Sequence, residues 1–228
     1  MLTEELRKIL YDAGARLVGF ADMRGVAASP LPYGACVALP VPVPIVREIE
    51  EGPTLAYWET YNTLNARLND IVNEGAAFLK SRNYEAIPVT TGYALQDEER
   101  RTSLPYKTVA TRAGMGWIGK SCLLVTPEYG SAVRISTLLT DAPLECGTPI
   151  TESRCGKCEL CRTHCPAEAL TGALWAPGTD RETLFHTETC VEVIRKRMKE
   201  RTGIDGTLCG KCFVVCPYTR KYVRKAEQ

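Results

Sequence analysis

The sequence lacks three features that would place it in a common class of protein. It has no excess of charge, with 28 Lys and Arg against 27 Asp and Glu, so no overall field attracts nucleic acid or an anionic membrane. It has no apolar run near the roughly 20 residues that cross a bilayer. Its opening, MLTEELRKIL, is too charged for a signal-peptide core. We therefore expect a cytoplasmic globular protein that forms one large domain or two small ones.

Histidine is scarce, whereas cysteine is abundant. The 228 residues include two histidines, His164 and His186, and eleven cysteines. Because the cytosol keeps thiols reduced, disulfides would not account for so many cysteines. Metal binding is the natural explanation.

Eight of the cysteines form two runs that each end in Cys-Pro. The first run, CGKCELCRTHCP, contains Cys155, Cys158, Cys161 and Cys165; the second contains Cys190, Cys209, Cys212 and Cys216. In bacterial two-cluster ferredoxins, the first three thiolates of a C-x2-C-x2-C-x3-C-P run bind one cubane and the fourth binds the other. This rule predicts cluster one at Cys155, Cys158, Cys161 and Cys216. It predicts cluster two at Cys165, Cys190, Cys209 and Cys212.

Zinc is the alternative metal, because paired C-x2-C motifs also suit tetrahedral zinc sites. Two consecutive x2 spacings followed by x3-C-P favour cubanes. The segment between Cys190 and Cys209 is predicted to be a helix that ends near Gly203. Since eight thiolates complete both clusters, we expect His164, beside Cys165, to be a surface or neighbouring group and not a ligand.

Three cysteines lie outside this pattern. Cys36 in ACVALPV and Cys122 in SCLLVT are in apolar, strand-like segments, so we expect both to be small buried hydrophobic residues. Cys146, in LECGT, is the one that we expect to be exposed. None of the three is given a role.

The chain before residue 150 mixes helices and strands. Helices are predicted over residues 3–14, 54–82 and 106–114, and strands over 16–22, 31–44, 84–90, 121–128 and 131–140. The prolines of the second strand suit an edge or a strand end. Because helices and strands do not alternate strictly, the pattern favours an α+β fold over a doubly wound sheet.

A glycine-rich turn lies between the third of these helices and the last two strands. In GMGWIGKS, Gly114, Gly116 and Gly119 allow a tight backbone and the close approach of a bulky ligand, and Lys120 could neutralise a phosphate. The turn matches the Walker pattern G-x4-G-K-[ST] literally. A P-loop, however, follows a strand and opens a helix, whereas here a helix comes first and an apolar strand follows. A nucleotide site is therefore not favoured.

At this point the chain resembles a known family. KTVATRAGMGWIGKSCLLVTPEYGSAVRISTLLTDAPL, followed by the eight-cysteine module, is similar to the epoxyqueuosine reductases, which are relatives of the corrinoid-dependent reductive dehalogenases; PYGACVALPVP and FLKSRNYEAIPV extend the likeness. The resemblance implies a nitroreductase-like cobalamin-binding domain over residues 1–148 and a ferredoxin-like domain with two [4Fe-4S] clusters over 149–228. It implies a corrinoid site at Gly114, Gly116, Trp117, Ile118, Gly119 and Lys120. Cobalamin is held in this family without a histidine below the cobalt, in agreement with the two histidines here.

The chain departs from the family in two places. The family has an acidic proton donor at a position that corresponds here to Arg100 or Arg101. The family also continues into a helical-repeat extension that helps to bind tRNA, whereas the sequence here stops at Gln228. We therefore expect an oxidoreductase that takes electrons from a donor protein and delivers them at low potential to a corrinoid, either its own or that of a partner corrinoid protein. A tRNA partner is not expected.

Two alternatives stay open. One is a cobalamin-dependent reductase of epoxyqueuosine or another small substrate, with Asp97, Glu98, Glu99 or Tyr106 as the proton donor. The other is a plain two-cluster ferredoxin whose amino-terminal domain only docks partners. Bound cobalamin separates the ferredoxin from the rest, and substrate turnover separates a reductase from a carrier.

Overall fold

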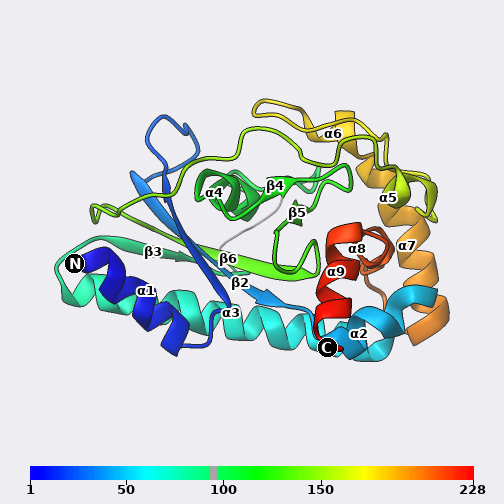
Figure 1. Cartoon of the computed structure of the whole chain (residues 1–228), viewed down its shortest axis with the longest axis horizontal. Helices are drawn as coiled ribbons and strands as arrows, with labels where there is room; N and C mark the ends of the chain where they lie inside the picture. Colours follow the sequence, from blue (N-terminus) through cyan, green and yellow to red (C-terminus); the bar gives the residue numbers. More distant parts are fainter. Residues whose placement is uncertain (93–96) are drawn as a thin grey trace. The chain divides into compact units, whose positions relative to one another are not determined.

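A computed structural model describes residues 1–92 and 97–228, which form two compact units (Figure 1). Unit 1 comprises Met1–Pro40, Thr63–Gly116 and Arg134–Ile150; unit 2 comprises Val41–Asn62, Trp117–Val133 and Thr151–Gln228. The units are interleaved along the chain, whereas the predicted division was a single boundary at residue 148. The difference arises because Val41–Asn62 and Trp117–Val133 pack with the cysteine-rich segment.

Unit 1 is built on a four-stranded sheet of order β1-β2-β6-β3. Its strands are β1 (Leu17–Asp22), β2 (Tyr33–Pro40), β3 (Ala86–Val89) and β6 (Val133–Thr140). β1 pairs antiparallel with β2, and β3 pairs antiparallel with β6. Antiparallel pairs and helices in one unit confirm the predicted mixed α and β class. The nitroreductase-like arrangement stays a prediction.

Helices cover both faces of this sheet (Figure 1). They are α1 (Leu2–Asp12), α3 (Leu55–Ser81, from Thr63 onward in unit 1) and α4 (Tyr106–Arg112). On one face, a Cβ atom at Gly75 of α3 would lie 2.7 Å from the side chain of Leu10 and 2.8 Å from that of Leu138. On the other face, a Cβ atom at Gly34 would lie 2.9 Å from Val109 of α4. Glycine therefore lets helix and sheet approach closely on each side.

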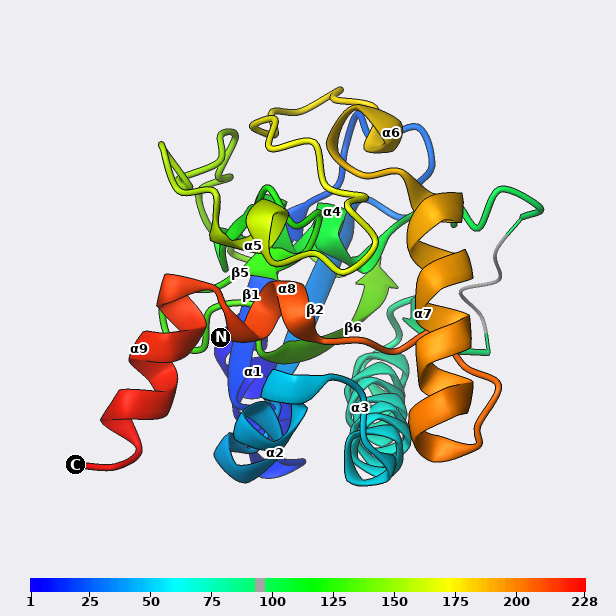
Figure 2. The same cartoon turned by 90° about the vertical axis from the view of Figure 1, so that its right-hand side faces the viewer.

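Unit 2 consists of one small hairpin and mostly short helices (Figure 2). The hairpin is β4 (Trp117–Ile118) with β5 (Leu124–Val125); the helices are α2 (Val43–Glu48), η1 (Ile49–Glu51), α5 (Leu160–Thr163), α6 (Arg181–Leu184), α7 (Thr187–Thr202), α8 (Lys211–Val214) and α9 (Pro217–Lys225). α8 packs against α5, α9 and η1. The Tyr57 ring meets the Phe213 ring edge-on, with centroids 5.9 Å apart.

Several local predictions are confirmed, and one is wrong. β2 ends at Pro40, and Cys36 is fully buried within it. α7 ends at Thr202, just before Gly203, whose φ of 75° is left-handed, and Cys146 is exposed. Cys122 is buried but lies in a turn with a φ of 58°, not in a strand, because the chain reverses there to form the hairpin. None of the helices in the described parts of the chain is long and apolar enough to cross a membrane.

Candidate metal centre

Each cysteine run contains a C-G-K-C segment with a left-handed glycine. Gly156 in the first turn has a φ of 55°, and Gly210 in the second has a φ of 80°. Glycine adopts this left-handed conformation without the steric cost that other residues meet. In the first turn the Cys158 N–H donates to the Cys155 carbonyl over 3.1 Å. In both runs, glycine therefore supplies the left-handed residue between the cysteines of a C-x2-C pair; in the second run, α8 begins directly after it, at Lys211.

Short helices position the remaining cysteines. Cys161 lies on α5, and the Cys165 N–H donates to the Arg162 carbonyl just after that helix, over 3.2 Å. Cys212 lies on α8, and Cys216 is the residue that precedes α9. All eight cysteines of the two runs are half-buried, so their thiols are partly shielded but not sealed from solvent.

Four thiols form a first group around Cys161. Burial raises the pKa of Cys161 to about 11, and nearby thiols contribute to this rise: Cys155, Cys158 and Cys216. Burial likewise raises the pKa of Cys216, and Cys155 and Cys158 add to it, while backbone N–H groups of Thr219 and Tyr218 lower it. These four residues are the predicted ligands of cluster one.

The other four thiols form a second group. Burial raises the pKa of Cys190 to about 12, with contributions from Cys165 and Cys209. Burial also raises the pKa of Cys212 strongly, and four thiols contribute: Cys209, Cys190, Cys161 and Cys165. The structure thus brings together the members of each predicted group, with Cys212 also near Cys161 of the first. The assignment of individual iron ligands stays a prediction.

A cubane makes different demands on its ligands from those of a single metal ion. In residues 1–92 and 97–228, no three His, Cys, Asp or Glu side chains converge closely enough to hold one ion. A [4Fe-4S] cluster instead takes one thiolate at each of four iron atoms, so its thiolates surround a larger space. Two groups of four thiols fit this requirement.

The glycine-rich turn is divided between the two units. Gly114 belongs to unit 1. Two features require glycine there: its φ is 73°, and a Cβ atom at this position would lie 2.7 Å from the Thr148 carbonyl oxygen. Gly119 belongs to unit 2, where a Cβ would lie 2.8 Å from Val125 and 3.4 Å from Cys155 Sγ. Packing within the chain therefore accounts for these two glycines. The corrinoid site assigned to this turn, with buried Gly116 and half-buried Ile118, stays a prediction.

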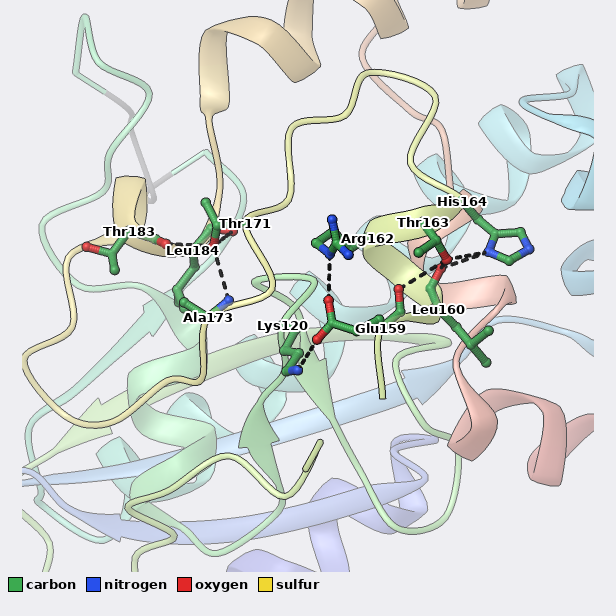
Figure 3. Close-up of polar contacts among 10 residues, drawn as sticks. All are labelled: Lys120, Glu159, Leu160, Arg162, Thr163, His164, Thr171, Ala173, Thr183 and Leu184. Carbon is green, nitrogen blue, oxygen red and sulfur yellow. Dashed lines mark hydrogen bonds and ion pairs between the residues drawn. The ribbon is translucent and has the colours of Figure 1, made fainter. Parts of the chain in front are cut away.

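Lys120 is bound by a residue that the sequence did not point to. Its buried ammonium group forms an ion pair with Glu159 Oε1, and Glu159 Oε2 accepts a 2.6 Å hydrogen bond from Arg162 Nε (Figure 3). Both cations lower the pKa of Glu159, Lys120 most strongly. Lys120 therefore links the turn to the loop of the first cysteine run. The sequence held no signal for this partner, because Glu159 lies 39 positions away.

Trp117 lies between the neighbours of two cluster-one cysteines. Its ring meets the Tyr218 ring edge-on at 4.9 Å, and the Arg154 guanidinium lies 5.6 Å from its centroid. The side chain is 1% exposed, yet its Nε1–H has no hydrogen-bond partner among the described residues. Arg154 precedes Cys155, and Tyr218 follows Cys216 by two positions.

His164 and the candidate proton-donating acids lie at the surface. His164 follows α5 and is exposed, and its Nδ1 lies 3.0 Å from the carbonyl oxygen of Leu160 in that helix (Figure 3). Of the possible acids, Asp97 accepts a 2.8 Å hydrogen bond from the Arg101 N–H, and Glu99 accepts one of 3.1 Å from Arg101 Nε.

Comparison with known proteins agrees with these features. Residues 154–219 match the family model of the 4Fe-4S double cluster binding domain, which confirms the prediction of two iron–sulfur clusters. The chain is 32% identical to the epoxyqueuosine reductase of Listeria monocytogenes over 157 residues, and 36% identical to that of Bacillus subtilis over 121 residues. The chain is thus similar in sequence to the epoxyqueuosine reductases. These matches cover 66% and 50% of this chain.

Solved structures show the same fold. A catabolic reductive dehalogenase matches 98% of this chain with a TM-score of 0.72 and 18% identity. An epoxyqueuosine reductase from Streptococcus thermophilus matches 95% of it with a TM-score of 0.60 and 20% identity. The chain spans only part of these relatives: 38% of the Listeria protein, 33% of the dehalogenase chain and 66% of the Streptococcus chain.

Proposed function

We propose that this protein is a cobalamin-dependent iron–sulfur reductase. Eight cysteines would hold two [4Fe-4S] clusters, which would supply electrons one at a time to a corrinoid bound by the same chain. The observation that carries the proposal is the gathering of eight half-buried thiols into two groups of four, with the glycine-rich turn against Cys155 of the first group. Clusters of this kind reach the low potentials that corrinoid reduction requires.

The likeness to reductases extends well beyond the cluster-binding segment. The Listeria match covers 66% of the chain, and the dehalogenase shares its fold over 98%. One solved dehalogenase of this fold is described as having B12-dependent chemistry, with a TM-score of 0.71. These likenesses favour a reductase over both electron delivery to a separate corrinoid protein and a plain ferredoxin. We therefore put the reductase first, ahead of the carrier that the sequence alone suggested.

Different residues of the chain have different roles in this proposal. The eight cysteines hold the clusters, and the Lys120–Glu159 pair fixes the glycine-rich turn beside Cys155. A bound corrinoid would supply a nucleophilic, redox-active cobalt. The substrate would be an epoxide such as epoxyqueuosine. Its reduction to the alkene takes two electrons, supplied through the clusters, and two protons, and it releases the oxygen as water, so a proton donor is required.

Glu98 and Tyr106 are the donors to test first. Asp97 and Glu99 would have to leave Arg101 before either could deliver a proton. Glu98 is exposed. Tyr106 is half-buried at the start of α4. Replacing the true donor should slow product formation and leave cluster content unchanged.

Anaerobic turnover tests the proposal. The chain with full clusters, cobalamin and a chemical reductant is mixed with a tRNA stem loop that carries epoxyqueuosine, and queuosine is measured; Glu98→Gln and Tyr106→Phe are compared. We expect multiple turnovers that need both cobalamin and reductant. Electron transfer to free or protein-bound cobalamin without any product, from this substrate or from small epoxides, would establish the carrier instead.

A further inference from the structure

The indole N–H of Trp117 is a buried donor without an acceptor. Leaving such a group unpaired costs roughly 1–3 kcal/mol, so buried donors nearly always have a partner. Its side chain is 1% exposed, which leaves little access for solvent. No oxygen, nitrogen or sulfur atom of the described residues accepts from it. An acceptor that is not part of the polypeptide would resolve this.

Two ring contacts place Trp117 beside the first group of thiols. Its ring packs on Tyr218, two positions after Cys216, and under the guanidinium of Arg154, which precedes Cys155. The hairpin that contains Trp117 fixes its position further. Trp117 pairs with Val125 in the hairpin, and the hairpin continues through the hydrogen bond from the Gly119 N–H to the Leu123 carbonyl.

The pleat of this hairpin gives Trp117 its direction. Residues two apart on an extended segment point to the same side. The Cβ direction at Gly119 leads to Cys155 Sγ, 3.4 Å away. Trp117 therefore lies on the side of the hairpin that faces Cys155. Its ring also packs on Tyr218, which follows Cys216, a second cysteine of cluster one.

We propose that Trp117 Nε1–H donates a hydrogen bond to an inorganic sulfide of cluster one. This inference rests on the clusters of the proposed function and does not depend on its substrate. A hydrogen bond to cluster sulfur stabilises the reduced, more negative state and so raises the reduction potential. Trp117 would then help to set the reduction potential of cluster one. This role differs from the corrinoid contact that the sequence predicted for Trp117.

Trp117 supplies its donor from a side chain. A side-chain donor can be removed by substitution, whereas a backbone donor cannot.

Potentiometric titration of the Trp117→Phe protein tests the inference. Phenylalanine keeps an aromatic ring against Tyr218 and Arg154 but removes the N–H. With full iron and sulfide content, we expect one cluster potential to become more negative and the other to stay unchanged, as read by electron paramagnetic resonance. Trp58→Phe is the matched control, because this half-buried tryptophan of the same unit packs near Gly206, and we expect it to change neither potential.

Two results would overturn the inference. One is a fully loaded Trp117→Phe protein in which both potentials equal those of the wild type. If that variant does not load its clusters, a second protein is used. It carries Trp58→Phe and Trp175→Phe, so that Trp117 is the tryptophan that remains, and its indole is labelled with 15N. We expect a 15N coupling to the reduced cluster, and its absence would contradict the hydrogen bond. Failure of epoxide turnover in the same preparations would count against the proposed function alone.

Discussion

The ion pair between Lys120 and Glu159 has two unequal members. The Lys120 side chain is 6% exposed, whereas that of Glu159 is 36% exposed and also bonds to Arg162. Glu159→Gln therefore leaves a buried cation without a carboxylate, which is costly. Lys120→Met leaves a carboxylate that keeps Arg162 and water.

We expect both variants to unfold at lower urea concentration than the wild type, with Glu159→Gln affected more. Urea unfolding of the proteins with full clusters measures the order. Arg162→Met is the control, since Arg162 is exposed on α5 and its pair with Glu159 is a surface pair of small worth. A larger loss for Lys120→Met than for Glu159→Gln would contradict the argument from burial.

The cysteine pKa values make cluster retention depend on pH. Burial and neighbouring thiols raise the pKa of Cys161 to about 11 and that of Cys190 to about 12. At neutral pH the free thiols are therefore protonated, and each must release a proton to bind iron. Binding consequently weakens as pH falls, by up to about tenfold per pH unit for each proton displaced.

We expect a chelator to remove iron faster at about pH 6.5 than at about pH 8.5, because protons compete with iron for the thiolates. Loss of the cubane absorption with time is the measurement, with chelator affinity corrected for pH. Equal retention across this range would show that the thiols are not held in the protonated form in the metal-free protein.

At the level of elements, Gly130 ties the end of the hairpin region to α9. Its φ is 59°, and a Cβ there would lie 2.2 Å from the Thr219 backbone nitrogen. The Ser131 N–H also donates to Thr219 Oγ1 over 3.1 Å. Backbone atoms cannot move aside as a flexible side chain can, so an added methyl group would force the two segments apart.

Gly130→Ala should therefore lower the free energy of unfolding by about 2–4 kcal/mol, from overpacking together with the left-handed backbone. Gly203→Ala at the end of α7 is the matched control. Its φ is 75° but nothing lies within 4 Å of the added methyl, so only about 1–2 kcal/mol is expected from the backbone. Equal losses in denaturant unfolding would mean that contact with Thr219 is unimportant.

The elements with strong local signals could be predicted from the sequence. The apolar periodicity of α3 and the glycine after α7 gave nearly correct limits. The β4–β5 hairpin was missed because its strands have two residues each, too few for periodicity to appear. Cys122 was placed in a strand for the same reason, since an apolar run does not reveal a turn within it.

At the scale of the whole molecule, the interleaving of the two units could not be read from the sequence. Periodicity reports which face of a segment is buried, but not which other segment buries it. Val41–Asn62 joins unit 2 through contacts such as Tyr57 with Phe213, which are far apart in sequence. The cysteine groups were predictable, in contrast, because the spacing of ligands in two-cluster ferredoxins is a local pattern.

Iron and sulfide content of the anaerobically purified chain tests the central claim most directly. With two cubanes we predict about eight iron and eight sulfide per chain. Cys155→Ser and Cys190→Ser should each lower both counts toward about four, because each removes a ligand of a different cluster. Cys146→Ser, at the exposed cysteine outside both groups, should change neither count. About two zinc ions per chain with negligible sulfide, the content expected of tetrahedral zinc sites, would contradict the account.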